Sequence, residues 1–184
     1  HGGKKSSSER MTIRAARTVG KDRRSVQING GRKVTRREAR EHCFKMLFCQ
    51  DFYPAEEKEE QLERYFEAPK EDVTGEDGKD EILHDPFEKE EDRAYLEKRV
   101  EKIMELIPEI DEKINEIAEG WRTRRMGKVE LTILRLAVFE MKYVEEIPEK
   151  VAINEAVELA KKFGGDEAPA FVNGILAKLI QKGN

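Results

Sequence analysis

Apolar residues that recur every three or four positions are the feature that most limits what this chain can fold into. The clearest run has spacings of four, three and four, in Leu96, Val100, Ile103 and Ile107. One face of an α-helix has this period, whereas a half-buried strand alternates at every second residue. We find no alternating stretch, so the sequence predicts an all-α fold.

The composition agrees with helices that have long solvated faces. Charged residues make up 40% of the 184 positions and aromatic residues only 7%, a balance that is poor for a sheet protein. The chain is long enough for one domain with a core, or for two very small ones. It has no apolar run that could span a membrane and no secretory signal, so we expect a cytoplasmic protein with no membrane partner.

The periodic segments predict about seven helices in two small packed bundles. We expect a folded domain over 34–184, with subdomains of about 34–107 and 108–184, because Pro108 is typical of the start of a new helix. Breaks at proline and glycine place the other ends. The expected helices cover about 35–52, 55–66, 96–107, 108–121, 128–143, 150–164 and 169–180.

Charge is unevenly distributed along the chain. Residues 1–45 hold 14 lysines and arginines against 4 acidic residues. Residues 1–33 also have almost no large apolar side chains, so we expect a disordered basic leader. It is either an arm that meets a polyanion such as a nucleic acid, or a tag followed by a non-native extension.

The next part of the chain is acidic. Residues 54–92 hold 17 acidic residues against 5 basic ones. Within this region, residues 68–88 combine Pro, Gly and Asp, which predicts a long mobile loop of unknown role.

The residues that most often carry chemistry form no recognisable site. Cys43 and Cys49 lie six positions apart on one expected helix, so they point to different faces and are not expected to pair. His1, His42 and His84 form no ligand pattern with them. No phosphate loop, calcium loop or nucleophile with a base is present, so we expect no enzymatic activity, no metal and no cofactor.

Three arginines at the start of the first expected helix are the strongest candidate for binding. Thr35 and Glu38 form a capping box that begins this helix. Arg36, Arg37 and Arg40 then fall on one side of it. Cations beside a helix N-terminus are unfavourable unless an anion compensates them, so the cluster indicates phosphate binding; a solvated helix end is the plainer interpretation.

Polar and aromatic residues near the C-terminus are also open to two interpretations. Phe171, one turn into the last helix, is either a core residue or a platform for a splayed base. We expect Asn154 to cap the sixth helix, and Asn173 with Gly174 to let two helices approach closely.

Four blocks of sequence closely resemble the NusB family of bacterial transcription antitermination factors. They are Thr-Arg-Arg-Glu-Ala-Arg-Glu (35–41), Gly-Lys-Val-Glu-Leu-Thr-Ile-Leu-Arg-Leu-Ala-Val-Phe-Glu (127–140), Val-Ala-Ile-Asn-Glu-Ala-Val-Glu-Leu-Ala-Lys (151–161) and Phe-Val-Asn-Gly-Ile-Leu (171–176). The resemblance implies two helical subdomains, no enzymatic activity and a partnership with the ribosomal protein NusE. It also implies binding of boxA-type single-stranded RNA from ribosomal RNA leaders, within an RNA polymerase complex that resists termination. A monomer or a weak homodimer is expected.

The resemblance also suggests which residues bind RNA. Arg36, Arg37 and Arg40 match the arginine-rich start that contacts RNA in the family. Glu167 and Phe171 match the acidic and aromatic positions at the RNA-proximal edge of the last helix pair.

A second set of matches concerns the protein partner. Glu130 matches a carboxylate that faces NusE, and the surface around Phe48 is the alternative partner site. Two positions depart from the family pattern, since Glu38 replaces a basic residue and Ala170 stands where a lysine can occur.

Two other functions remain as alternatives. A similar helical domain precedes the catalytic domain of some ribosomal RNA cytosine methyltransferases, so the chain could be such a domain in isolation. A purely structural interaction bundle is the third reading, and it leaves the arginine cluster without an anion.

Overall fold

A computed structural model describes residues 34–68, 71–74, 80–84, 90–120 and 122–183 of the chain. The basic leader predicted for residues 1–33 therefore lies outside the described residues. Contacts divide the chain into two compact units, His1–Lys98 and Arg99–Asn184. This division falls earlier than the predicted boundary near Pro108.

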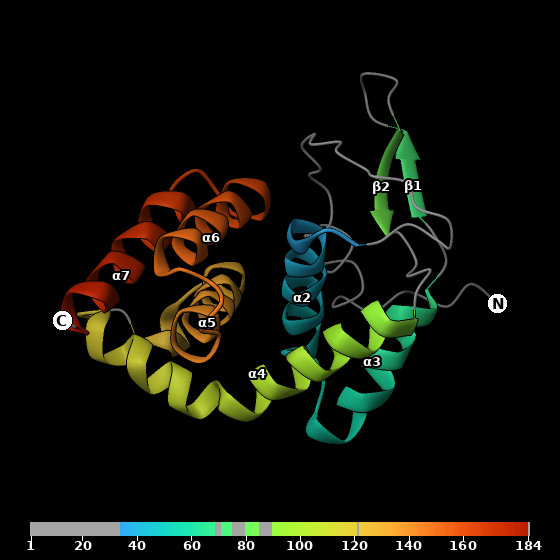
Figure 1. Cartoon of the computed structure of the whole chain (residues 1–184), viewed down its shortest axis with the longest axis horizontal. Coiled ribbons are helices and arrows are strands. Elements are labelled where there is room, and N and C mark those ends of the chain that lie inside the picture. Colours follow the sequence, from blue (N-terminus) through green and yellow to red (C-terminus); the bar gives the residue numbers. More distant parts are fainter. Residues whose placement is uncertain (1–33, 69–70, 75–79, 85–89, 121, 184) are drawn as a thin grey trace. The chain divides into compact units, whose positions relative to one another are not determined.

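The described residues are helical apart from one short hairpin, which confirms the all-α class (Figure 1). Six α-helices and two 3₁₀ turns are present in these residues. In chain order the elements are α2 (Arg36–Gln50), η1 (Ala55–Glu57), α3 (Lys58–Glu67), β1 (Glu71–Thr74), β2 (Asp80–His84), α4 (Glu90–Ile117), η2 (Thr123–Arg125), α5 (Lys128–Tyr143), α6 (Glu149–Phe163) and α7 (Ala168–Lys182).

Helix α2 forms the centre of the first unit and packs against α3. The predicted capping box begins it: the Thr35 hydroxyl accepts from the Glu38 amide at 3.2 Å, and the Glu38 carboxylate accepts from the Thr35 amide at 2.9 Å. The buried side chains of the two helices are Cys43, Phe44, Met46, Leu47, Phe48, Gln50, Leu62 and Phe66. Both cysteines are free thiols, as predicted.

The prediction of a long mobile loop over 68–88 is wrong in part, because β1 and β2 pair there as an antiparallel hairpin. The rest of that prediction, over 69–70, 75–79 and 85–88, lies outside the described residues. Thr74 pairs with Asp80 and Val73 with Glu81, and a bulge lies between Glu71 and Asp72. The strands have four and five residues. Strands this short and acidic show no alternation of apolar and polar residues, which explains why the sequence did not reveal them.

The expected helix break at Pro108 is also wrong, since α4 runs through it without interruption. Proline inside a helix removes one hydrogen bond and crowds the preceding turn. The apolar stripe continues across it, however, with Ile103, Ile110 and Ile114 all fully buried. We infer that burial of this continuous stripe outweighs the local cost of the proline.

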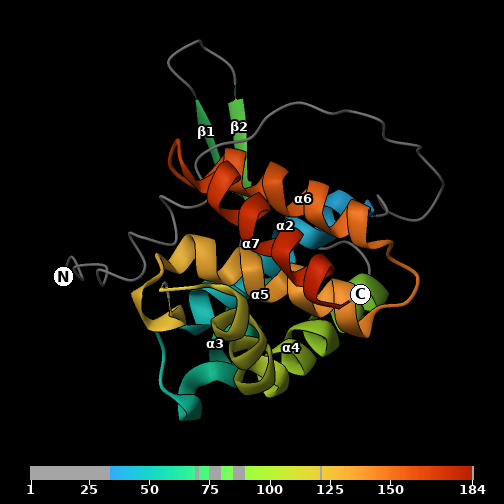
Figure 2. The ribbon, with the colours of Figure 1, turned by 90° about the vertical axis from the view of Figure 1, so that its left-hand side faces the viewer.

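The second unit is built from α5, α6 and α7 with the C-terminal part of α4. Helix α5 packs against both α6 and α7, and α6 packs along α7, as Figure 2 shows. Helix α5 is buried on several sides, as its sequence predicted; its fully enclosed side chains include Ile133, Leu134 and Val138. Asp111 of α4 accepts two hydrogen bonds from the Arg135 guanidinium of α5, both at 2.8 Å.

The connection between α6 and α7 is tight. A Cβ added to Gly164 would lie 2.8 Å from the backbone oxygen of Ala160 and 2.5 Å from the Cβ of Ala168. No side chain fits in that space, so this glycine allows the first turn of α7 to approach the end of α6. The predicted end of the sixth helix at this glycine pair is confirmed.

The expected roles of the two asparagines are wrong. Helix α6 begins at Glu149 with Pro148 as its N-cap, so Asn154 lies inside the helix and caps nothing. Asn154 and Asn173 are both exposed. A Cβ added to Gly174 would meet no atom within 4 Å, so no close helix approach occurs there. The buried faces of α6 and α7 therefore do not include Asn154 and Asn173, which the sequence had placed within them.

Candidate nucleic-acid interface

The three predicted RNA-binding arginines occupy the first turns of α2. Arg36 and Arg37 are exposed and Arg40 is half-buried. All three lie within five positions of a helix that the capping box holds in place, so their Cα atoms have fixed spacing on one side of α2. Guanidinium groups in this arrangement can bind neighbouring phosphates through paired hydrogen bonds.

Glu38 lies among these arginines, but its carboxylate is directed to the start of the helix. It accepts a hydrogen bond from the Thr35 amide at 2.9 Å. The preceding residue is also held, because the Val34 amide donates to Asp92 of α4 at 3.4 Å. Glu38 therefore has a structural role in beginning α2.

A second contact fixes α2 on its other side. His42 of α2 shares a hydrogen bond through Nδ1 with the Tyr65 hydroxyl of α3, and the two rings meet edge to face with centroids 5.9 Å apart. Part of the Tyr65 ring reaches solvent, yet burial of its hydroxyl raises the pKa well above the usual value, with smaller contributions from the nearby thiols and Glu41. Sequence reasoning missed this pair, because neither residue breaks the helical pattern.

The other two predicted RNA-binding residues lie at the start of α7, in the second unit. Glu167 is the exposed N-cap residue, and its carbonyl accepts from the Phe171 amide at 3.1 Å. Phe171 is half-buried, so one part of its ring packs inside and the other part reaches solvent. The structure therefore places the five predicted residues in two groups, three on α2 and two on α7.

The two predicted partner residues differ in their exposure. Glu130 is half-buried in the first turn of α5, where its carboxylate folds back over the N-cap residue Gly127. Phe48 is only 4% exposed, and it packs between Phe44 and Phe52 with centroid distances of 6.0 and 5.2 Å. Glu130 can present a charge to a partner, whereas Phe48 is a core residue with little surface.

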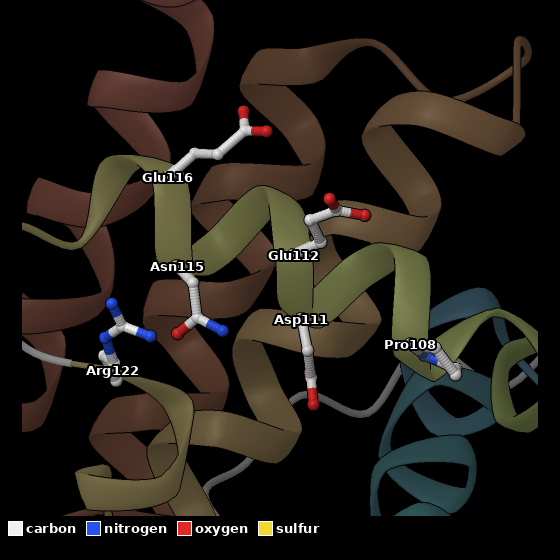
Figure 3. Close-up of a pocket in the computed structure, with 6 residues that line it drawn as sticks. All are labelled: Pro108, Asp111, Glu112, Asn115, Glu116 and Arg122. Carbon is white, nitrogen blue, oxygen red and sulfur yellow. The ribbon is translucent and has the colours of Figure 1, made fainter.

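Metal sites, membrane-spanning helices and pockets are the other features that could point to a function in the described residues. Across the described ranges, no three His, Cys, Asp or Glu side chains are placed to hold a metal ion. None of the helices described here combines the length and the apolar character needed to cross a membrane. One shallow depression lies on the C-terminal half of α4, and polar side chains line it (Figure 3).

Comparison with known proteins decides the family. The sequence pattern of the NusB family matches residues 37–181, which cover all the described helices except the first residue of α2 and the last of α7. The chain belongs to the NusB family. Members of this family are antitermination factors without enzymatic activity, so the chain is a NusB-type transcription antitermination protein.

Relatives in the NusB family are similar along almost their whole length. The transcription antitermination protein NusB of Lachnoclostridium phytofermentans is 48% identical over 147 residues, which span 80% of this chain and 99% of that protein. The protein of the same name from Agathobacter rectalis is 45% identical over 147 residues, with 79% and 98% covered.

Solved NusB structures share the fold. The NusB of T. maritima is 27% identical and superimposes with a TM-score of 0.63, over 82% of this chain and 93% of that one. A second similar chain comes from a crystal structure of antitermination factors NusB and NusE in complex with double-stranded RNA. It is 25% identical with a TM-score of 0.55, and the match covers 80% and 96% of the two chains.

Proposed function

We propose that this chain pairs with the ribosomal protein NusE and binds boxA-type single-stranded RNA of ribosomal RNA leaders. The pair then joins an RNA polymerase complex that resists termination. The observation that carries the proposal is the set of arginines on the capped start of α2, in a chain of the NusB family. In support, a structural neighbour was crystallised with NusE and RNA.

The arginines supply the electrostatic part of binding. Arg36, Arg37 and Arg40 lie in the first five residues of α2, so three cations stand beside the start of the helix. Phosphate groups would compensate the unfavourable placement of these charges beside the helix N-terminus. Contacts of this kind position the RNA without reading its sequence.

Sequence preference requires contacts with bases, and the start of α7 offers them. Phe171 is half-buried and lies four residues after the exposed Glu167. An aromatic face can stack on an unpaired base, and a carboxylate can accept from a base amino group. Stacking on the aromatic face needs a base that is not paired, which favours a single-stranded ligand over a duplex.

The methyltransferase alternative has less support. Proteins named as antitermination factors match this chain over 98% to 99% of their own length. That match favours an antitermination factor over a domain taken from an RNA-modifying enzyme.

A titration of labelled RNA tests the proposal. The full chain is titrated, with and without NusE, against a boxA-type single strand, a scrambled single strand and a duplex of the boxA sequence. We expect the tightest binding for the boxA single strand, with a further increase when NusE is present. Equal affinity for all three RNAs in both conditions would refute the proposed specificity.

A further inference from the structure

The turn between α4 and α5 is strongly basic. Between positions 122 and 129 the chain has four cations and no acidic residue, namely Arg122, Arg124, Arg125 and Lys128. The chain as a whole has a formal net charge of −4, so the sign of this turn is opposite to that of the whole molecule. Neither the α2 arginines nor the start of α7 includes this turn.

Specific contacts hold the described residues of the turn in place. Gly120, with a φ of 77°, reverses the chain after α4, a conformation that favours glycine. The side-chain oxygen of Asn115 then accepts from the Thr123 amide at 2.8 Å, and its nitrogen donates to the Thr123 hydroxyl at 3.4 Å. Met126 closes the turn with a side chain that is 8% exposed. The 3₁₀ turn η2 is therefore held at both of its ends.

This anchoring leaves the arginines exposed. Arg122, Arg124 and Arg125 are all exposed, while Thr123 and Met126 take the inner positions. Arg122 lines the depression on α4 together with Glu112 and Glu116, so two carboxylates partly offset its positive charge. Figure 3 shows its guanidinium beside Asn115. Lys128 lies two residues before Glu130, whose carboxylate folds over Gly127.

Arg124 and Arg125 are different from these two cations. No carboxylate in the described part of the chain lies within ion-pair distance of either side chain. The backbone of this turn is already held in place, so little backbone entropy is lost when the two exposed guanidiniums bind a ligand. The planar fork of each guanidinium matches the oxygens of a phosphate group.

We propose that Arg124 and Arg125 form a second contact for the phosphate backbone of RNA, separate from the arginines of α2. The contact is independent of base sequence, because it recognises phosphate groups only. This inference rests on the proposed RNA binding. It extends the length of RNA that the protein contacts, so nucleotides beyond the boxA element contribute to affinity. A protein partner is less favoured here, since the surface expected to face Glu130 is basic and these arginines would repel it.

The test compares two double variants of the full chain. Arg124→Gln/Arg125→Gln removes the proposed contact, and Lys150→Gln/Lys178→Gln removes the same charge from two exposed positions on α6 and α7. Each is titrated over a range of salt concentrations with two single-stranded RNAs, one limited to the boxA element and one extended at both ends. The conservative variant Arg124→Lys/Arg125→Lys keeps the charge and checks that any loss does not come from misfolding.

We expect the glutamine variant to bind the extended RNA roughly tenfold more weakly at low salt. Its log–log salt slope should fall by about 0.7 for each lost phosphate contact. The control variant and the lysine variant should keep the slope of the parent chain. If the glutamine variant and the control have the same affinity and slope with the extended RNA, the inference is wrong.

Two further results separate the causes of failure. Loss of NusE pairing with unchanged RNA binding would mean that the turn contacts protein, and it would overturn the inference. If substitution of the α2 arginines also leaves RNA binding unchanged, the proposed function itself is wrong. If RNA binding weakens on substitution of the α2 arginines but not of Arg124 and Arg125, only the proposed second contact is wrong.

Discussion

At the scale of single residues, the arginines of α2 give the sharpest prediction. We expect substitution of Arg36, Arg37 and Arg40 by alanine to weaken RNA binding and to lower the salt slope by about 2, at about 0.7 for each contact. Fluorescence anisotropy over a range of salt concentrations measures both quantities. Alanine at Arg64, Lys98 and Lys102, three exposed cations on α3 and α4, is the matched control. A slope equal to that of the control would show that other residues hold the phosphates.

Glu130 gives a prediction about the protein partner. Glu130→Lys should abolish pairing with NusE because it opposes a basic surface, while RNA binding by the isolated chain stays the same. A carboxylate near a helix N-terminus contributes only about 0.3–1 kcal/mol, so the melting temperature should change little. Pull-down with NusE and thermal denaturation measure the two effects, and Glu130→Gln separates loss of charge from its reversal. Normal pairing by the lysine variant would show that the partner binds elsewhere.

Residue roles could be predicted where local chemistry alone decides them. The Thr35–Glu38 capping box follows from two side chains three positions apart, and the structure confirms it. The capping role predicted for Asn154 was wrong because it depends on where α6 begins. Pro148 is the N-cap of that helix, and no side chain caps it. The exposure of Phe48 depends on its neighbours in space, which its sequence position does not reveal.

At the scale of elements, the contact between α2 and α3 should make stability depend on alkaline pH. Burial raises the pKa of Tyr65 above its ordinary value of 10.0, so the folded chain keeps this proton after the unfolded chain has lost it. Stability is therefore complete below about pH 10 and decreases as the pH rises toward the folded pKa. Urea unfolding between neutral and alkaline pH measures this decrease.

Tyr65→Phe is the control for that prediction. The variant cannot ionise at this position, so its stability should decrease less steeply above about pH 10 than that of the parent. It should also lose about 0.5–1.5 kcal/mol at neutral pH, because the hydrogen bond to His42 is absent. Identical pH dependence in both chains would mean that Tyr65 ionises normally.

Elements were predictable when their period was long and regular. The stripe of α5 and the stop at Gly164 gave the correct helices. Pro108 did not end α4, because the burial of Ile110 and Ile114 on the same stripe as Ile103 favours one continuous helix. The β1–β2 hairpin was missed, since pairing between two short strands depends on backbone hydrogen bonds that composition does not indicate.

At the scale of the whole molecule, the uneven charge predicts how the basic leader and the α2 arginines share RNA binding. We expect deletion of residues 1–33 to lower affinity equally for boxA and scrambled RNA, because a basic arm attracts any polyanion. The shortened chain should remain sensitive to substitution of Arg36, Arg37 and Arg40. Salt titrations of the shortened chain with and without these substitutions measure this. If the substitutions have no effect after the deletion, the α2 arginines do not hold the phosphates of the RNA.

The capping box has a consequence for how α2 can hold an anion. Helix N-termini attract anions, but here the chain supplies its own, since the Glu38 carboxylate already accepts from the Thr35 amide. A tethered group has a high effective concentration, so a free phosphate cannot easily displace it. Arginine side chains must then supply the attraction, and backbone amides contribute little. The strength of RNA binding can therefore change through surface substitutions alone, while the start of the helix and the fold around it stay the same.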